Sequence, residues 1–282
     1  MSPVSRSGGP AGYQDEQRAL SSSEHRRLAD ILLNAARAGR AIPSLSETFR
    51  EMTVADAYGI RDMLLARRVS EGDHLIGAKV SLGRAGAEHR HMAPDPQLGW
   101  LTDRMLISSG TVDLSHLIHP RVEPRLGFLL ARPLREPIAA GIDLLAATER
   151  VLPCLEIVDP RYDGAHPRLA DDIADNCATA GLLLGEGVPP PAEGHLRRVR
   201  LQLQADGVVR APAPRAHAIV PPLEAATWLA NRMLRGAHRP EPGMLLVCPV
   251  ASRPVELLPG LRVTARFEGI GSVDLQALPS TC

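Results

Sequence analysis

The pattern of apolar and polar positions predicts two amphipathic helices near the start of the chain. In SSSEHRRLADILLNAARAGR, which begins at residue 21, apolar residues recur every three or four positions from Leu28 to Ala35. Serines stand before the first turn and Gly39 follows the last one, as is typical of helix caps. A second helix is expected to begin at Thr53, because Thr53-Val54-Ala55-Asp56 resembles a capping box with Asp56 as the shorter acid.

From about residue 75 the pattern changes to short apolar runs separated by Gly, Pro and Asp, which indicates strands. The expected strands cover residues 75–81, 98–107, 117–131, 151–159, 180–185, 197–204, 244–248 and 261–267. The pair Asp206-Gly207, between two such runs, predicts a hairpin turn. Helices are expected near 141–150, 169–177 and 222–236.

These elements divide the chain into three parts. Residues 1–22 are predicted to be a flexible tail, because they contain no apolar stretch of signal-peptide length. Residues 23–72 form the predicted N-terminal helical layer, and residues 73–282 form a β-rich domain of catalytic type. A chain of 282 residues is long enough to bury a large core.

Composition excludes several classes of function. The 32 basic and 32 acidic residues cancel, which gives no general attraction to nucleic acid or to anionic lipid. No run approaches the roughly 18 apolar residues of a membrane span, so a cytoplasmic protein is expected. The cysteines form no CxxC pair and are expected to be reduced and buried; they are Cys154, Cys177, Cys248 and Cys282.

Lys79 is the only lysine among the 32 basic residues. It lies in LIGAKVSLG, an apolar run that is typical of a buried strand, where an unpaired ammonium is costly. Arginine can replace lysine on a solvated surface, but its guanidinium cannot exchange a proton near neutral pH as a buried amine can. The surviving lysine therefore indicates acid/base chemistry, with a structural ion pair as the alternative.

Two glutamates stand in predicted strands, where glutamate is unexpected. In VLPCLEIVDPR, Glu156 shares a face with apolar neighbours, because side chains alternate along a strand. In HPRVEPRLGFLL, Glu123 and Arg125 share a face by the same spacing. A structural explanation is that Glu123 and Arg125 neutralise each other.

Six ordered segments together resemble one known family: IGAKVSLG, LGWLTDRM, IHPRVEPRLGF, LPCLEIVDPR, ADDIADN and FEGIGSV. Their order and spacing are similar to those of the 2-oxopent-4-enoate hydratase and 4-oxalocrotonate decarboxylase family, of the fumarylacetoacetate hydrolase superfamily. The resemblance extends from about residue 25 to residue 275. It implies an α+β fold with a mixed β-roll core and outer helices. It also implies a lyase that decarboxylates or hydrates a 2-oxo or 2-enol carboxylic acid.

The resemblance also implies a magnesium or manganese ion held by three carboxylates, and such hard cations take oxygen ligands. Glu123 and Glu156 match two of the metal positions, and Lys79 matches the lysine of the family. The implied substrate-binding residues are Gln97, Arg161, Asp175 and Asn176.

Arg125 stands where the family has its third metal-binding glutamate. A guanidinium would pair with Glu123 or Glu156, so metal affinity is expected to be reduced or absent. Arg125 then becomes a candidate catalytic residue beside Lys79, because it can bind a carboxylate or an enolate in place of the ion.

Three hypotheses for function remain open. The chain is a lyase with a weakly held ion, or a metal-independent biosynthetic enzyme for tautomerisation, cyclisation or elimination that uses Lys79 and Arg125. The third is a non-catalytic partner subunit, suggested by losses such as Ala178 in place of the usual serine. A homo-oligomer and association with a related enzyme are expected from the family, with a small carboxylic acid as the ligand.

Overall fold

The computed structural model describes residues 19–82, 96–164, 167–210 and 220–279. Its helices are α1 Ser22–Ala38, α2 Leu45–Thr48, α3 Val54–Ser70, α4 Gly141–Ala147, α5 Leu169–Ala174, α6 Glu193–Leu196 and α7 Pro222–Leu234, with short 3-10 turns η2 Asp103–Met105 and η3 Asn176–Ala178. Its strands are β1 Leu75–Ser81, β2 Gln97–Thr102, β3 Thr111–Val112, β4 Arg121–Leu130, β5 Thr148–Val158, β6 Thr179–Leu184, β7 Leu201–Ala205, β8 Val208–Arg210, β9 Leu245–Pro249, β10 Val255–Glu256, β11 Arg262–Phe267 and β12 Gly271–Ala277.

The two predicted N-terminal helices are confirmed, together with the caps that define them. Ser21 and Glu24 form a capping box at the start of α1, and Gly39 ends the helix in the left-handed conformation. Thr53 and Asp56 form the second capping box, at the start of α3. Reciprocal side-chain bonds of this kind satisfy backbone N–H groups that have no partner inside the helix.

The larger sheet curls so that its two edges approach each other. Its strands run in the order β2-β1-β9-β4-β5-β6, with β10 on β4, and parallel and antiparallel pairs are mixed. After β2 the chain turns through η2, and Ile107 N donates to Leu182 O of β6 at 2.9 Å. The segment that follows one edge strand thus pairs with the other edge strand, which makes the sheet a roll.

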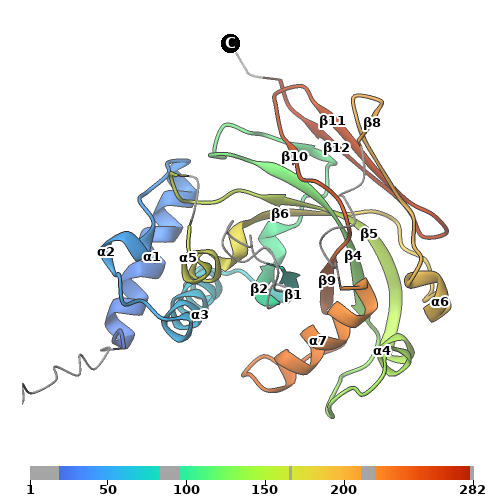
Figure 1. The fold of residues 1–282 in the computed structure, drawn as a ribbon, viewed down its shortest axis with the longest axis horizontal. Helices are drawn as coiled ribbons and strands as arrows, with labels where there is room; N and C mark the ends of the chain where they lie inside the picture. Colours follow the sequence, from blue (N-terminus) through green and yellow to red (C-terminus); the bar gives the residue numbers. More distant parts are fainter. Residues whose placement is uncertain (1–18, 83–95, 165–166, 211–219, 280–282) are drawn as a thin grey trace, which may run out of the picture.

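A second sheet has the order β3-β12-β11-β7-β8 and lies beside the roll (Figure 1). Along β11 and β12, buried residues such as Val263 and Leu275 alternate with exposed ones such as Asp274, as expected for a sheet with one solvated face. The hairpin predicted at Asp206-Gly207 joins β7 to β8.

Helices cover the roll from outside, with α7 and α4 on one side and the N-terminal helices on another (Figure 1). The helices α1 and α3 share a small hydrophobic core with α5, to which Ile173 and Ala174 contribute. The predicted α+β class, with a mixed curled sheet and outer helices, is confirmed. The division into a tail, a helical layer and a β-rich domain stays a prediction, and residues 1–18 of the tail lie outside the described residues.

Several expectations from the pattern need correction. The strand expected over 98–107 ends at Thr102, because η2 turns the chain from one edge of the roll toward the other. The strand β12 was not expected, although its buried and exposed residues alternate regularly. The helix expected over 169–177 ends at Ala174, and the chain continues into a left-handed turn.

Candidate active site

Lys79 lies at the centre of the roll, where β1 runs between β2 and β9. Its side chain is fully buried, and Nζ forms an ion pair with Glu156 Oε1. The same nitrogen donates to the backbone carbonyl of Cys177 at 2.8 Å. The amine is therefore held from two sides, by a carboxylate of β5 and by a carbonyl of η3.

A line of alternating charges continues from the Lys79 amine through Glu156, Arg125 and Glu123. Arg125 Nε lies 2.8 Å from Glu156 Oε2, in an ion pair, and its Nη2 donates to Glu123 Oε2 at 2.7 Å. The two glutamates face each other across the β4–β5 pair, where their Cα atoms are in register. Arg125 and Glu156 are buried, whereas the side chain of Glu123 is 27% exposed and forms the solvent-facing end of the line.

The guanidinium of Arg125 remains a cation in this setting. Burial alone would lower the pKa of Arg125, but the nearby charges of Glu156 and then Glu123 outweigh burial and raise the pKa above its ordinary value. The cluster of Lys79, Glu156, Arg125 and Glu123 thus contains two positive and two negative groups and is electrically balanced.

The residues of this cluster do not fit a divalent cation. Both oxygens of Glu156 face cations of the protein, and Glu123 is paired with Arg125. A divalent ion here would lie beside a guanidinium with two carboxylates at most. Among the residues that the structure describes, no group of three or more His, Cys, Asp or Glu side chains is arranged to hold a metal.

The segment after α5 adopts an unusual backbone conformation. Asn176, Cys177 and Ala178 all have positive φ angles, of 51°, 52° and 59°, so that η3 is a left-handed turn without glycine. Each such residue costs roughly 1–3 kcal/mol unless its surroundings impose the conformation. This turn presents the Cys177 carbonyl to Lys79, so the strained backbone lies directly at the amine.

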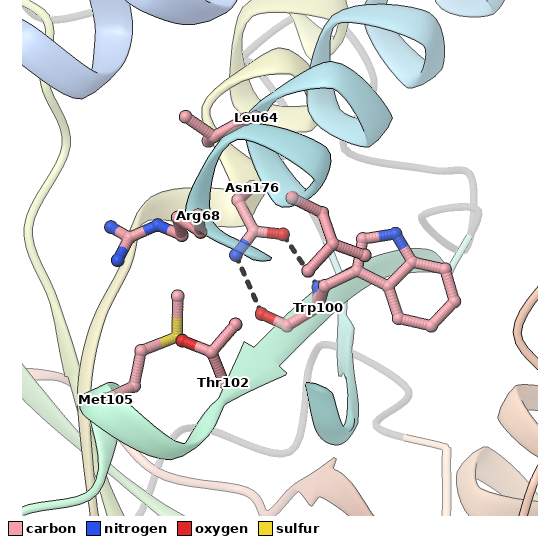
Figure 2. A pocket seen from close by; sticks show the side chains of 7 residues that line it. Leu64, Arg68, Trp100, Thr102, Met105 and Asn176 are labelled. Atoms are coloured by element: carbon pink, nitrogen blue, oxygen red, sulfur yellow. Dashed lines mark hydrogen bonds between the residues drawn. The ribbon is translucent and has the colours of Figure 1, made fainter. Parts of the chain in front are cut away.

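Asn176 connects this turn to β2 through its side chain (Figure 2). Its Oδ1 accepts from Trp100 N at 2.7 Å and its Nδ2 donates to Trp100 O at 2.8 Å. Beside this contact lies a small pocket whose lining includes Arg68, Thr102 and Met105. The pocket is separate from the charged cluster, because its lining contains neither Lys79 nor Glu156.

The other predicted substrate-binding residues occupy two different places. Arg161 and Asp175 form a separate buried ion pair, in which Arg161 also donates to the carbonyl of Asp175 at 2.6 Å. Burial raises the pKa of Asp175 to about 6, although Arg161 opposes the shift. Gln97 is buried at the start of β2, in register with Ser81. Substrate binding by these residues and by Asn176 stays a prediction.

The described cysteines are free and buried, as expected, and are Cys154, Cys177 and Cys248. Burial raises the pKa of the Cys177 thiol to about 11 and that of Cys154 to about 12, so neither is a thiolate near neutral pH. Cys282 lies outside the described residues. In the part of the chain that the structure describes, no helix is long and apolar enough to cross a membrane.

Comparison with known proteins decides the family. The chain is 30% identical over 255 residues to 2-keto-4-pentenoate hydratase of Paraburkholderia xenovorans, a match that covers 90% of this chain and 95% of the hydratase. The chain belongs to the 2-oxopent-4-enoate hydratase and 4-oxalocrotonate decarboxylase family. The family prediction is thereby confirmed, and membership places the chain among lyases. No family model matches the chain.

Solved structures agree with this family. The 4-oxalocrotonate decarboxylase of Pseudomonas putida G7, solved with magnesium and adipate, has a TM-score of 0.82 at 28% identity and covers 93% of this chain and 100% of its own. The fumarylpyruvate hydrolase of Pseudomonas aeruginosa, solved with Mn²⁺ and pyruvate, has a TM-score of 0.51 at 16% identity. This match covers 72% of this chain and 89% of the hydrolase, and it shows the shared fold. The expectation that divalent metals associate with the family is confirmed.

Sequence reasoning missed two features of the site in this family member. Gly99 faces Lys79 across the β1–β2 pair, and a Cβ at Gly99 would lie 3.1 Å from Lys79 Cε. An isolated glycine inside a strand pattern indicates such a close approach, so this feature had a signal. The contact of Lys79 with the Cys177 carbonyl had none, because a backbone group leaves no mark in the sequence.

Proposed function

We propose that this chain is a lyase that decarboxylates or hydrates a 2-oxo or 2-enol carboxylic acid, with Lys79 as the proton carrier in a remodelled metal site. The observation that supports this most directly is the buried amine of Lys79, held between Glu156 and the Cys177 carbonyl. The family relatives are named for hydration and decarboxylation of such acids.

Both reactions need one proton at carbon and a cation near an enolate oxygen. In hydration, a proton adds to one carbon of a C=C bond and the hydroxyl of water adds to the other. In decarboxylation, the bond to the leaving carboxylate breaks, CO₂ departs, the electron pair enters the enolate, and a proton is then taken up at carbon. Lys79 is suited to deliver that proton, because a lysine exchanges protons and Glu156 can return one to it.

Arg125 is suited to bind the anionic end of the substrate. Its Nη2 donates to Glu123 and its Nη1 to the carbonyl of Val80, while Nε lies in an ion pair with Glu156. A guanidinium carries five N–H donors in all. The remaining donors can bind a carboxylate or an enolate oxygen. The cation faces Glu156 Oε2 at 2.8 Å, so it supplies positive charge where the family uses an ion.

This cation also favours a second candidate function. A metal-independent enzyme with Lys79 as acid/base and Arg125 as anion anchor could perform tautomerisation, cyclisation or elimination, all of which move one proton beside an enolate. Decarboxylation and hydration remain the first candidate, because relatives that match nearly the whole chain are named for these reactions.

The test follows the ultraviolet absorbance of 2-hydroxypent-2,4-dienoate and of 4-oxalocrotonate with purified protein, in chelator and in added Mg²⁺. We expect absorbance to fall at the same rate in both conditions. Lys79→Met should lower the rate by at least about 100-fold, the usual contribution of a positioned acid/base group. Lys79→Arg should be equally slow, because guanidinium keeps the charge but does not exchange the proton.

Two outcomes would count against this proposal. A rate that requires Mg²⁺ would mean that an ion displaces Arg125 from the glutamates. If thermal melting shows that the chain is folded and it turns over neither acid, the result would favour the metal-independent alternative or a non-catalytic partner subunit. Co-expression with a catalytically active family member would then identify the partner subunit by a stable complex.

A further inference from the structure

We infer that Asn176 is a positioning residue for the Lys79 amine, a role that rests on the proposed function. Asn176 does not contact Lys79 through its side chain. Its side chain bonds β2 to the left-handed turn at residues 176–178. The carbonyl of the following residue in this turn, Cys177, accepts from Lys79 Nζ. The Asn176 contact fixes the position of the turn, and with it the direction of the Cys177 carbonyl, relative to β2.

The Asn176 amide acts as a short substitute for a neighbouring strand. β2 is the last strand in the path β2-β1-β9-β4-β5-β6, so the outward N–H and C=O groups of Trp100 have no strand beside them. Asn176 bonds to both of them, at 2.7 and 2.8 Å. Trp100 is paired with Ala78 and Gly99 with Lys79, so this contact fixes β2 one residue from the amine.

The backbone of the turn is fixed at several successive carbonyls. The Asp175 carbonyl accepts from Arg161 Nη2 at 2.6 Å, and that of Asn176 accepts from Thr179 Oγ1 at 2.9 Å. The Ala178 carbonyl accepts from Asp159 N at 2.8 Å. The Cys177 carbonyl lies between these anchored groups and is aimed at Lys79. A strained turn held at this many points indicates that its exact carbonyl direction matters.

Asparagine suits this position for two reasons. It tolerates the left-handed conformation better than other non-glycine residues, and its amide offers both an acceptor and donors. Cys177 and Ala178 have no such tolerance, so they depend on the anchors around them. The identity of residue 176 therefore determines whether the following carbonyl stays in line with the amine.

The chain provides a direct readout, because Lys79 is its only lysine. Protein produced with isotope-labelled lysine gives a single side-chain Cε signal by NMR, without assignment, and this signal reports the surroundings of the amine. The test variant is Asn176→Gly, which accepts the left-handed backbone and removes only the amide. The matched control is Asp206→Gly, in the β7–β8 turn. Asp206 also has a positive φ, and its side chain also accepts from a backbone N–H, that of Arg262, at 2.9 Å.

We expect Asn176→Gly to shift the lysine signal and to lower kcat by roughly 10- to 100-fold, as small displacements of a reacting group do. KM should change by less than about twofold, because in this role the Asn176 amide bonds to Trp100 and not to the substrate. Asp206→Gly should leave the signal, kcat and KM as in the unmodified chain. An unshifted lysine signal in Asn176→Gly would overturn the inference, whether or not the proposed reaction is observed.

A second variant keeps the test decisive if Asn176→Gly does not fold. Asn176→Asp preserves the size and the acceptor for Trp100 N, and replaces the donor to Trp100 O by a second acceptor. It should shift the lysine signal in the same direction, with a smaller loss of kcat. A lysine signal identical to that of the unmodified chain would refute a positioning role in this variant too. If both variants and the control lost turnover alike, the cause would be a general structural effect instead.

Discussion

At the scale of single residues, the charged cluster was accessible from the sequence, and its backbone contacts were not. The two-residue period of strands placed Glu123 and Arg125 on one face, and the structure joins them at 2.7 Å. The contact between Lys79 and Glu156 needed the resemblance as well, because 77 positions separate the two residues. The left-handed turn at 176–178 could not be predicted, because cysteine and alanine rarely adopt positive φ.

Asp175 gives stability a pH dependence that opposes the usual trend for acids. Its pKa is about 6 in the folded chain, chiefly through burial, against an ordinary value of 3.8. Between these values the folded chain keeps a proton that the unfolded chain has released. The free energy of unfolding should therefore fall as pH rises from about 4 to about 6, by up to about 3 kcal/mol from this group.

Urea denaturation of the chain and of Asp175→Asn, at intervals across this pH range, measures the effect. The variant does not titrate at this position, so the difference in unfolding free energy between the two proteins isolates Asp175. That difference should decline with rising pH and level off above about pH 7. A difference that is constant, or that grows with pH, would mean that the Arg161 ion pair dominates burial.

At the scale of elements, local patterns predicted most of the longer strands, and missed the short strands and β12. The strand β1 was predicted with its observed bounds, Leu75–Ser81. The two-residue strands β3 and β10 are too short to leave a periodic pattern. The strand β12 alternates clearly, so it could have been predicted from Val273, Leu275 and Ala277.

Because β1 and β2 pair closely, we expect substitution of Gly99 to affect activity as well as folding. A Cβ at Gly99 would meet the Asn176 carbonyl at 3.0 Å and Lys79 Cε at 3.1 Å. Gly99→Ala should push the amine out of line and lower kcat by roughly 10-fold or more. Its cost in stability should be about 1–3 kcal/mol, the usual cost of overpacking.

Gly127→Ala is the matched control for this effect. It adds the same methyl group to another strand of the same sheet, where the Cβ would lie 3.0 Å from Cys154 Sγ. A similar loss of stability is expected there, with kcat retained, as measured by thermal melting and steady-state kinetics. Equal losses of kcat in both variants would mean that Gly99 acts only through general packing.

At the scale of the whole molecule, the order of elements alone did not reveal the roll. Its closure depends on one pairing, of the segment after β2 with β6, between residues far apart in the sequence. The resemblance supplied this arrangement, and the TM-score of 0.82 with the decarboxylase of Pseudomonas putida G7 agrees with it. The chain therefore keeps the family fold, and the resemblance of its sequence predicts that the charged cluster differs from the family pattern at Arg125.

If Arg125 replaces a glutamate of the family, as the resemblance implies, that one position accounts for the charge of a divalent ion. Replacing a glutamate by Arg125 changes the cluster by two positive charges, which is what a bound Mg²⁺ would contribute. The cluster of Lys79, Arg125, Glu123 and Glu156 is already balanced, so it offers an added ion no net attraction to offset the cost of removing that ion from water. The unmodified chain should accordingly show the same melting temperature in chelator and in millimolar Mg²⁺.

The reverse substitution should recreate a metal site within the same fold. In Arg125→Glu, three carboxylates, two of them buried and the partly exposed Glu123, would face one ammonium, so the variant should be less stable than the parent in chelator. Mg²⁺ should then raise its melting temperature by roughly 5–10 °C, because an ion that binds only the folded state stabilises it by mass action. Arg125→Met, which removes the cation without adding a ligand, should respond much less. If Mg²⁺ stabilised the unmodified chain as strongly as Arg125→Glu, the guanidinium could not be occupying the place of the ion.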